Sequence, residues 1–387
     1  MAHDTGDSGF LQREGVRAAI IQIVVVGLLI TAILYLANNV AENLARQGIA
    51  TGFGFLDNPT EWDVGEAILP HDRADPYWWT FVVGVANTLY VAALSLVLIT
   101  VIGIAVGTSR VSNNWLLSQF ASAYVEVFRN VPLILQIIFW YTVTREFPHI
   151  RDAVNFGDVL LLSNRGANFP LLTDAPGYFF GVVAFLIGIV ATILTGRYSE
   201  HHRSKTGKPI AVWPFAILFL LILPLTIWAL LGAPTELNNP VPSKFGVKGG
   251  GSISPEFIAL LLGLSMHYGA QVGEIVRSGI ESVPPGQTEA ARAIGLKERR
   301  IFSKVILPQT LRVAIPPTAS QYMSAVRNSS LAVAIGYPEL FSIGSTTINQ
   351  AGQAVEVMVI MLGVYLVISL VIAAVMNFFN HLVAFKT

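Results

Sequence analysis

Polar side chains follow one another at helical spacing within the apolar stretch 255–278. His267, Gln271, Glu274 and Ser278 are separated by four, three and four residues, so they share one face of a helix. Such a face could line a substrate path, because ionisable residues inside membrane segments are usually functional. It could equally supply hydrogen bonds between helices, with Glu274 as a charge at the helix end. A third interpretation is a proton relay through His267 and Glu274.

A second polar set, which includes Gln321, Arg327, Asn328 and Ser329, lies in the apolar stretch 311–335. An arginine at membrane depth is costly to bury, and Arg327 could hold a carboxylate through two parallel hydrogen bonds. The alternative is that Arg327 lies near the membrane surface and pairs structurally. The sequence therefore gives two candidate faces for a substrate pathway, and it suggests no catalytic residue.

The composition is that of a membrane protein. Of 387 residues, 53% are hydrophobic and only 12% are charged, about half the charged share of a soluble domain. The net charge of zero argues against a nucleic-acid partner. Without cysteine there is no disulfide framework or thiol chemistry, and the seven histidines suggest no metal site.

We predict eight membrane-spanning helices and a polar N-terminal tail over residues 1–12. Each predicted span is an apolar run long enough, or nearly so, to cross a bilayer. The spans are 18–37, 80–108, 120–143, 177–195, 210–231, 255–278, 311–335 and 355–382. Within the second, Gly103 and Gly107 would let another helix approach closely, and so would Ser265, Gly269 and Gly273 in the sixth.

The distribution of Lys and Arg predicts the orientation. With both termini on one side, that side holds fifteen basic residues and the opposite loops hold seven. The positive-inside rule then places both termini and the segment 277–312 in the cytoplasm. At the start of the third span, Glu126 and Arg129 are spaced to pair along one helix face, and Pro132 would kink the helix.

A charged segment, 279–308, interrupts the hydrophobic pattern. Its composition predicts a short helix over 289–294, a turn at Gly295, and a second helix that Pro308 ends. The chain contains no phosphate-binding Gly-rich loop, so the energy for transport must come from a partner or from an ion gradient. A cytoplasmic helix–turn–helix is a suitable docking element for such a partner.

This segment also resembles a known element. Gly286-Gln287, Glu289-Ala290-Ala291, Gly295 and Ile306-Leu307-Pro308 are similar to the EAA loop of ABC importer permeases, which couples the permease to a cytoplasmic ATPase. The resemblance implies that Gly286, Glu289, Ala290, Ala291, Gly295, Leu307 and Pro308 form the coupling site. Glu289 is then expected to accept a hydrogen bond from the ATPase, unless it only complements the helix dipole.

The same resemblance narrows the substrate. The run from Gly269 to Pro316 is similar to the polar amino-acid permeases, and Arg129 with Pro132 matches a further element of that family. Gln271 replaces the usual Tyr, and Asn328 replaces an acid, as in the general L-amino-acid permeases of alphaproteobacteria. This implies broad specificity for L-amino acids. The implied partners are a second permease (a paralogue or an identical copy), two ATPase subunits that bind ATP, and a periplasmic amino-acid-binding protein.

We therefore predict an all-α polytopic membrane protein with the type I ABC importer transmembrane fold, located in a bacterial inner membrane. Residues 1–79 would hold the first helix and a periplasmic loop, and 80–383 the permease domain. That domain would have a five-helix core, an inserted hairpin over about 145–254, and the coupling loop 279–308. No enzymatic activity and no cofactor are expected in this chain. The alternatives are an ATP-independent secondary carrier driven by protons and a non-transporting scaffold subunit.

Overall fold

The computed structural model describes residues 14–46, 51–157, 159–173, 175–207, 210–243 and 246–383. The predicted N-terminal tail, 1–12, lies outside these ranges. Two compact units are present: one combines the chain up to Leu96 with the chain from Ile275 onward, and the other comprises Val97–Glu274. The helices α2 (Tyr77–Arg110) and α8 (Pro255–Glu281) each contribute residues to both units.

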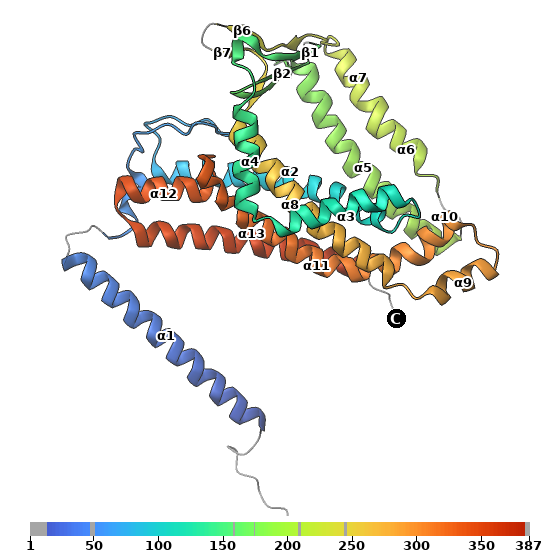
Figure 1. The fold of residues 1–387 in the computed structure, drawn as a ribbon, viewed down its shortest axis with the longest axis horizontal. Helices are drawn as coiled ribbons and strands as arrows, with labels where there is room; N and C mark the ends of the chain where they lie inside the picture. Colours follow the sequence, from blue (N-terminus) through green and yellow to red (C-terminus); the bar gives the residue numbers. More distant parts are fainter. Residues whose placement is uncertain are drawn as a thin grey trace, which may run out of the picture. The chain divides into compact units, whose positions relative to one another are not determined.

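The first unit contains most of the C-terminal half of the chain. Its remaining helices of eight or more residues are α1 (Glu14–Arg46), α9 (Pro285–Ala293), α11 (Leu307–Asn328), α12 (Leu340–Ala351) and α13 (Ala354–Val383) (Figure 1). The buried side chains of one core cluster in this unit come from α2, α12, α13 and a short 3-10 helix, Phe53–Asp57. They are Phe55, Tyr77, Phe81, Leu340, Ile343, Val357 and Met361.

A buried asparagine helps to attach the polar loop between α1 and α2 to the helix that follows it. Asn87 is fully buried on α2, and its amide donates to the carbonyls of Glu66 (2.8 Å) and Pro338 (2.9 Å). Its side-chain oxygen accepts from the backbone N–H of Ile68 at 3.1 Å. The predicted loop is therefore packed onto its helix.

The second unit begins with a sharply broken helix. The sequence predicted one span over 120–143, but α3 (Trp115–Asn130) and α4 (Leu133–Arg145) meet at an angle of 106°. The prediction of one kinked helix is wrong because Pro132 does more than remove a donor. Its ring holds the preceding Val131 in extended geometry (φ −85°, ψ 129°), which stops the first helix completely.

The segment predicted to be an inserted hairpin forms two helical arms in the second unit. Its first arm is α5 (Pro176–Thr206), and its second arm runs through α6 (Trp213–Ile217), a π turn (Leu218–Ile222) and α7 (Leu223–Leu230). Figure 1 shows the two arms side by side. A Cβ on Gly188 would collide with the carbonyl oxygen of Phe219, so the arms are in close contact there.

Short strands form in the two polar segments that flank this hairpin, where the sequence predicted only loops. A four-stranded antiparallel sheet has the order β1-β2-β3-β8, and two further pairs are β4–β5 and β6–β7. The strands of two to four residues are too short for a periodic pattern, and β3 pairs with β8 across the whole hairpin. Their bounds are Val154–Phe156, Leu160–Ser163, Gly166–Phe169, Leu171–Leu172, Leu237–Asn238, Val241–Ser243, Gly246–Lys248 and Gly251–Ile253.

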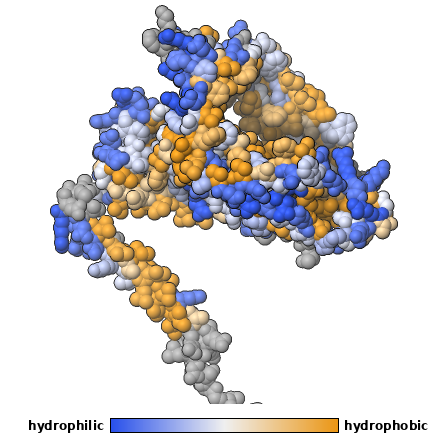
Figure 2. All heavy atoms as spheres, in the orientation of Figure 1, coloured by the Kyte–Doolittle hydropathy of each residue, from blue (hydrophilic) through white to orange (hydrophobic). Residues whose placement is uncertain are grey.

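Within the described residues, five helices are long and apolar enough to cross a membrane, or six if the bent pair α3–α4 is one span. Figure 2 shows the hydrophobic middle of α1, one of the five. Helices also occupy the positions of the predicted sixth and seventh spans, α8 and α11, but they are too polar to meet the same criterion. The count of eight spans stays a prediction.

Pro308 does not end a helix, contrary to the prediction from sequence. The short α10 (Glu298–Ile301) passes through a π turn (Phe302–Ile306) directly into α11. Proline lacks an N–H, and its ring clashes with the carbonyl four residues earlier in an α-helix. The wider π turn before Pro308 changes the hydrogen-bond ladder at that point, so the chain continues as a helix.

Candidate functional site

The predicted coupling segment is an elbow formed by α9 and α10. The helix α9 begins at Pro285, where the missing N–H and fixed φ of proline suit a first helical residue. It ends in a Schellman motif: the N–H of Leu296 bonds to the carbonyl of Ala291 (3.1 Å), and that of Gly295 to Arg292 (2.9 Å). Gly295 has φ +79°, as the predicted turn requires.

An ion pair bridges the elbow on its exposed side. The guanidinium of Arg292 donates from Nε to Oε1 of Glu298 at 2.7 Å and from Nη2 to Oε2 at 3.2 Å. These hydrogen bonds lower the pKa of Glu298 from its usual value. The pair joins the last turn of α9 to the first residue of α10, and so it opposes opening of the turn.

The elbow has an anchored side and a free side. Val283, Ala291 and Ile301 are buried, whereas Glu289 is exposed and Ile294 is 77% exposed. A large apolar side chain so open to water, on the same elbow as an exposed carboxylate, offers a partner both a hydrophobic and an ionic contact. The buried residues Val283, Ala291 and Ile301 hold this surface in place.

The structure divides the seven predicted coupling residues into three groups. Gly286, Glu289, Ala290 and Gly295 are exposed on the elbow, as a docking role requires. Ala291 is buried, so its small side chain serves packing. Leu307 and Pro308 lie at the start of the long helix α11 and not in the elbow itself.

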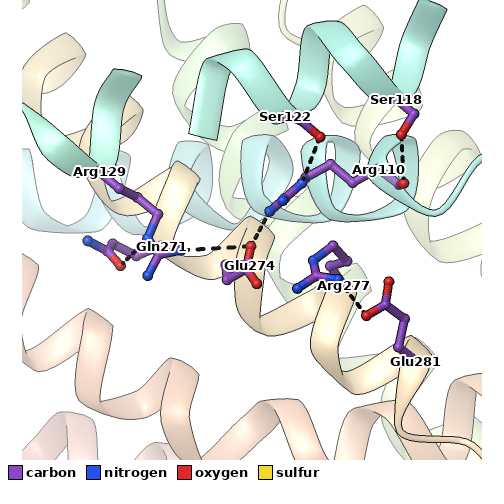
Figure 3. A network of polar contacts seen from close by, with 8 residues as sticks. All are labelled: Arg110, Ser118, Ser122, Arg129, Gln271, Glu274, Arg277 and Glu281. Atoms are coloured by element: carbon purple, nitrogen blue, oxygen red, sulfur yellow. Dashed lines mark hydrogen bonds and ion pairs between the residues drawn. The ribbon is translucent and has the colours of Figure 1, made fainter. Parts of the chain in front are cut away.

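The predicted polar face of α8 lies in the second unit and is engaged by side chains of α2, α3 and α4. Nε2 of Gln136 lies 3.0 Å from Nδ1 of His267, and Nε of Arg129 donates to Oε1 of Gln271 at 3.2 Å. The carboxylate of Glu274 pairs with Arg110 and lies 3.8 Å from Nη1 of Arg129 (Figure 3). The polar face is therefore in contact with other helices at three successive positions.

The break between α3 and α4 is part of this arrangement. The buried Gln136 donates from Nε2 to the carbonyls of Phe128 and Val131, both at 2.9 Å. Carbonyls at the end of a helix have no partner within the helix. The side chain of Gln136 therefore supplies the hydrogen bonds that are lost where Pro132 ends α3. Tyr124 adds a hydrogen bond from its hydroxyl to a carbonyl of α8, that of Met266, at 2.8 Å.

Sequence reasoning missed Arg110 and Gln136. Arg110 lies just beyond the predicted span 80–108 and was given no role, yet it is the last residue of α2 and its side chain is only 16% exposed. The only signal in the sequence was an arginine directly after an apolar run, which marks a charge at the end of a span and does not identify its partner. The predicted pair of Arg129 with Glu126 is absent from the ion pairs found among the described residues, because Arg129 reaches α8 instead.

The helix packing predicted from small residues is confirmed in the second unit. A Cβ on Gly103 would lie 2.5 Å from Val272, and one on Gly269 would lie 2.7 Å from Ile102. A Cβ on Gly273 would lie 3.1 Å from Val106. The end of α2 and the middle of α8 therefore pack at a distance that larger residues would not permit.

The second predicted polar set lies in the first unit. Arg327 is exposed at the end of α11, where Nη2 lies 3.4 Å from Oγ of Ser324. Ser329 is fully buried and donates to the carbonyl of Val326 at 2.8 Å, while Gln321 and Asn328 are half-buried. Ser329 thus has a structural bond, and the substrate role of the set stays a prediction. No cluster of three potential metal-ligating side chains occurs in the parts of the chain that the structure describes.

Comparison with known proteins supplies the family. Residues 188–385 match the binding-protein-dependent transport system inner membrane component family. The putative amino-acid ABC transporter permease YhdX of Escherichia coli K12 is 40% identical over 95% of this chain and 94% of its own length. The general L-amino acid transport system permease AapQ of Rhizobium johnstonii is 39% identical over 94% and 91%.

The name of a third relative specifies four amino acids. The glutamate/glutamine/aspartate/asparagine transport system permease BztB of Rhodobacter capsulatus is 35% identical over 96% of this chain and 94% of its own. All three align along almost the whole chain, including the inserted hairpin. The matched segment contains the elbow and both polar faces. The chain therefore belongs to the binding-protein-dependent transport system inner membrane components, as a multi-pass ABC importer permease of the inner membrane that is similar to amino-acid permeases.

Proposed function

We propose that this chain is the permease subunit of an ABC importer that moves L-amino acids into the cytoplasm, driven by ATP hydrolysis on a partner ATPase. The elbow is the observation that carries the proposal. It is a rigid turn whose free side presents Glu289 and Ile294, and whose buried side is anchored to the unit. A partner that pushes on Glu289 would move α9 as a whole, because the Schellman turn and the Arg292 pair resist local bending.

The partners follow from the family. We infer two ATPase subunits, a second permease subunit that is a paralogue or an identical copy of this chain, and a periplasmic amino-acid-binding protein. Both termini and the elbow would lie in the cytoplasm, where the ATPase is. No catalytic step is assigned to this chain, and ATP would be bound by the partner.

Broad specificity for amino acids is the finer part of the proposal. The names of the relatives refer to amino acids in general or to several of them. Asn328 offers hydrogen bonds without a charge, so it would not select for a basic or an acidic side chain. His267, Gln271, Glu274, Gln321, Arg327, Asn328 and Ser329 remain the candidate pathway residues.

The experiment is reconstitution of the complete complex with its ATPase and binding protein. We expect amino-acid uptake to require ATP, and Glu289→Arg or Gly295→Asp to abolish it while membrane insertion stays normal. Glu200→Arg, at an exposed position on α5 outside the elbow, is the matched control and should transport normally.

Two outcomes would reject the proposal. Uptake that a protonophore abolishes but loss of the ATPase leaves intact would show a proton-driven carrier. Normal uptake by both elbow variants would remove the coupling role of α9 and its turn.

A further inference from the structure

The hairpin formed by α5 and the arm α6–α7 carries a continuous stripe of exposed side chains on its first helix. The stripe begins with apolar residues and ends with polar and basic ones: Ile187, Val190, Leu194, Arg197, His201 and Lys205. We propose that it binds a phospholipid of net negative charge, with an acyl chain along the apolar part and the phosphate against Arg197 and Lys205. The inference goes beyond the proposed transport function and does not depend on it.

The six positions of the stripe lie on one face of α5. They follow one another at intervals of three or four residues, and with 3.6 residues per turn all six fall within an arc of about 80°. Each of them is exposed. The buried residues Ala184, Gly188 and Ser199 lie on a different side of the helix, and Gly188 is in close contact with the second arm. The stripe therefore faces away from the rest of the hairpin.

The stripe changes from apolar to basic where α5 would leave the hydrocarbon core of a bilayer. The 31 residues of α5 extend for about 46 Å, whereas the core is about 30 Å thick. The apolar part, 177–195, accounts for about 28 Å of this length. Arg197 and His201 then begin about 3 and 9 Å further along, at the level of the headgroups. The long side chain of Lys205 can reach back to the same level.

Two aromatic side chains place the membrane surface at the same level independently. Tyr198 is 61% exposed and directly follows Arg197, and Trp213, the first residue of α6, is 69% exposed. The buried Ser199 donates from Oγ to the carbonyl of Ile210 at 2.8 Å and accepts from the N–H of Ile210 at 3.1 Å. Trp213 is thus only three residues from a point beside Ser199. Exposed Tyr and Trp side chains are enriched at membrane–water interfaces, so the basic end of the stripe begins at an interface.

The basic end of the stripe has charge to offer an anionic headgroup. Neither Arg197 nor Lys205 takes part in an ion pair among the residues that the structure describes. The segment 197–208 contains four basic residues and one acid, Glu200. Arg197 and Lys205 are about 12 Å apart along the helix, so their long side chains can approach one phosphate from opposite sides. An acidic protein surface would also suit these charges, but it would not use the apolar residues that continue the stripe into the membrane.

Fluorescence quenching can measure which lipids lie beside the stripe. The chain has no cysteine, so Ser204→Cys, at an exposed position of α5, provides a single site for a fluorophore in the full chain. The labelled protein is reconstituted into phosphatidylcholine vesicles that contain a small fraction of nitroxide-labelled lipid. This lipid is either phosphatidylglycerol or phosphatidylcholine with the same nitroxide. The ratio of the two quenching levels reports the enrichment of the anionic lipid at the stripe.

We expect phosphatidylglycerol to be enriched by at least about tenfold at low salt, because each basic side chain near an anionic lipid contributes a preference of about fivefold. Most of this enrichment should disappear at about 1 M salt, where the screening length is only about 3 Å. Arg197→Gln and Lys205→Gln should each lower the enrichment about fivefold. Arg203→Gln is the matched control: it removes the same charge from the same helix, but on a different side from the stripe, and should change the enrichment by less than about twofold.

Three results would overturn the lipid site. Equal quenching by the two lipids would show that the stripe does not select an anionic headgroup. An equal loss of enrichment in Arg197→Gln and Arg203→Gln would show a diffuse effect of positive charge and no site on the stripe. Protection of the fluorophore from an aqueous quencher only when the ATPase is bound, without lipid enrichment, would assign the basic end to a protein contact. The measurement requires no transport, so a failure of uptake would refute the proposed function alone.

Discussion

Two glycines in the coupling segment allow a matched test of the elbow. Gly286 and Gly295 are both exposed, and a Cβ added to either would meet no atom within 4 Å. They differ in backbone conformation, because Gly295 has φ +79° and Gly286 lies in α9 with an ordinary helical φ. Substitution by alanine therefore changes only the free energy of the backbone conformation and adds no steric clash.

The two alanine substitutions should change the stability of the elbow in opposite directions. A non-glycine residue in the left-handed region costs about 1–2 kcal/mol, so Gly295→Ala should reduce the population of the closed elbow by about 5- to 30-fold. Gly286→Ala replaces a flexible residue in a helix and should stabilise α9 by roughly 0.5 kcal/mol. Gly295→Asn should lose less than Gly295→Ala, since asparagine tolerates this conformation better.

Hydrogen exchange of the amides in 285–301 is the direct assay. We expect faster exchange at Leu296, whose N–H closes the Schellman motif, in Gly295→Ala but not in Gly286→Ala. In the reconstituted complex, uptake should fall in the first variant only. Equal protection of the Leu296 amide in the two variants would refute the reasoning, because backbone conformation is the only difference between the two glycines on which the expected result depends.

Three further predictions concern packing, loop attachment and pH. Gly103→Ala should lower the stability of the protein in detergent by about 1–3 kcal/mol, measured by thermal unfolding, whereas Gly363→Ala, with open space around its Cβ, should not. Asn87→Ala should expose the loop before α2 to protease, because three backbone groups lose their side-chain partner. The Glu298 pair should stabilise the elbow above the ordinary glutamate pKa, and this gain should disappear as the pH falls through the lowered pKa of Glu298. The difference in exchange between wild type and Arg292→Gln should thus be present at pH 7 and vanish in acid.

Local patterns in the sequence predicted the elements that depend on local chemistry. Gly295 could be predicted as a turn because only glycine adopts φ +79° without cost. The small residues on α8 predicted a close helix contact, and the periodic polar positions predicted one face for His267, Gln271 and Glu274. Each of these features is determined within a few turns of one helix.

Contacts between distant segments were not predictable in this way. The pairing of Arg110 with Glu274 joins residues 164 positions apart, and no periodicity relates them. The strands β3 and β8 are also far apart in sequence, with Ala167 opposite Ile253, and they are too short to leave a pattern. Pro132 was predicted to kink a helix, but the extent of the bend depends on Gln136, which satisfies the carbonyls on the far side of the break.

The two π turns each end two residues before a proline: Ile222 precedes Pro224, and Ile306 precedes Pro308. A π turn contains one residue more than an α turn, so it rotates everything after it by about 100° relative to an unbroken helix. The extra residue in each π turn therefore allows the helix to continue past the proline. Deleting one residue from 302–306 would restore α-helical hydrogen bonding but place the Pro308 ring against a carbonyl. It would also rotate α11, with Gln321 and Arg327, about the helix axis relative to α10.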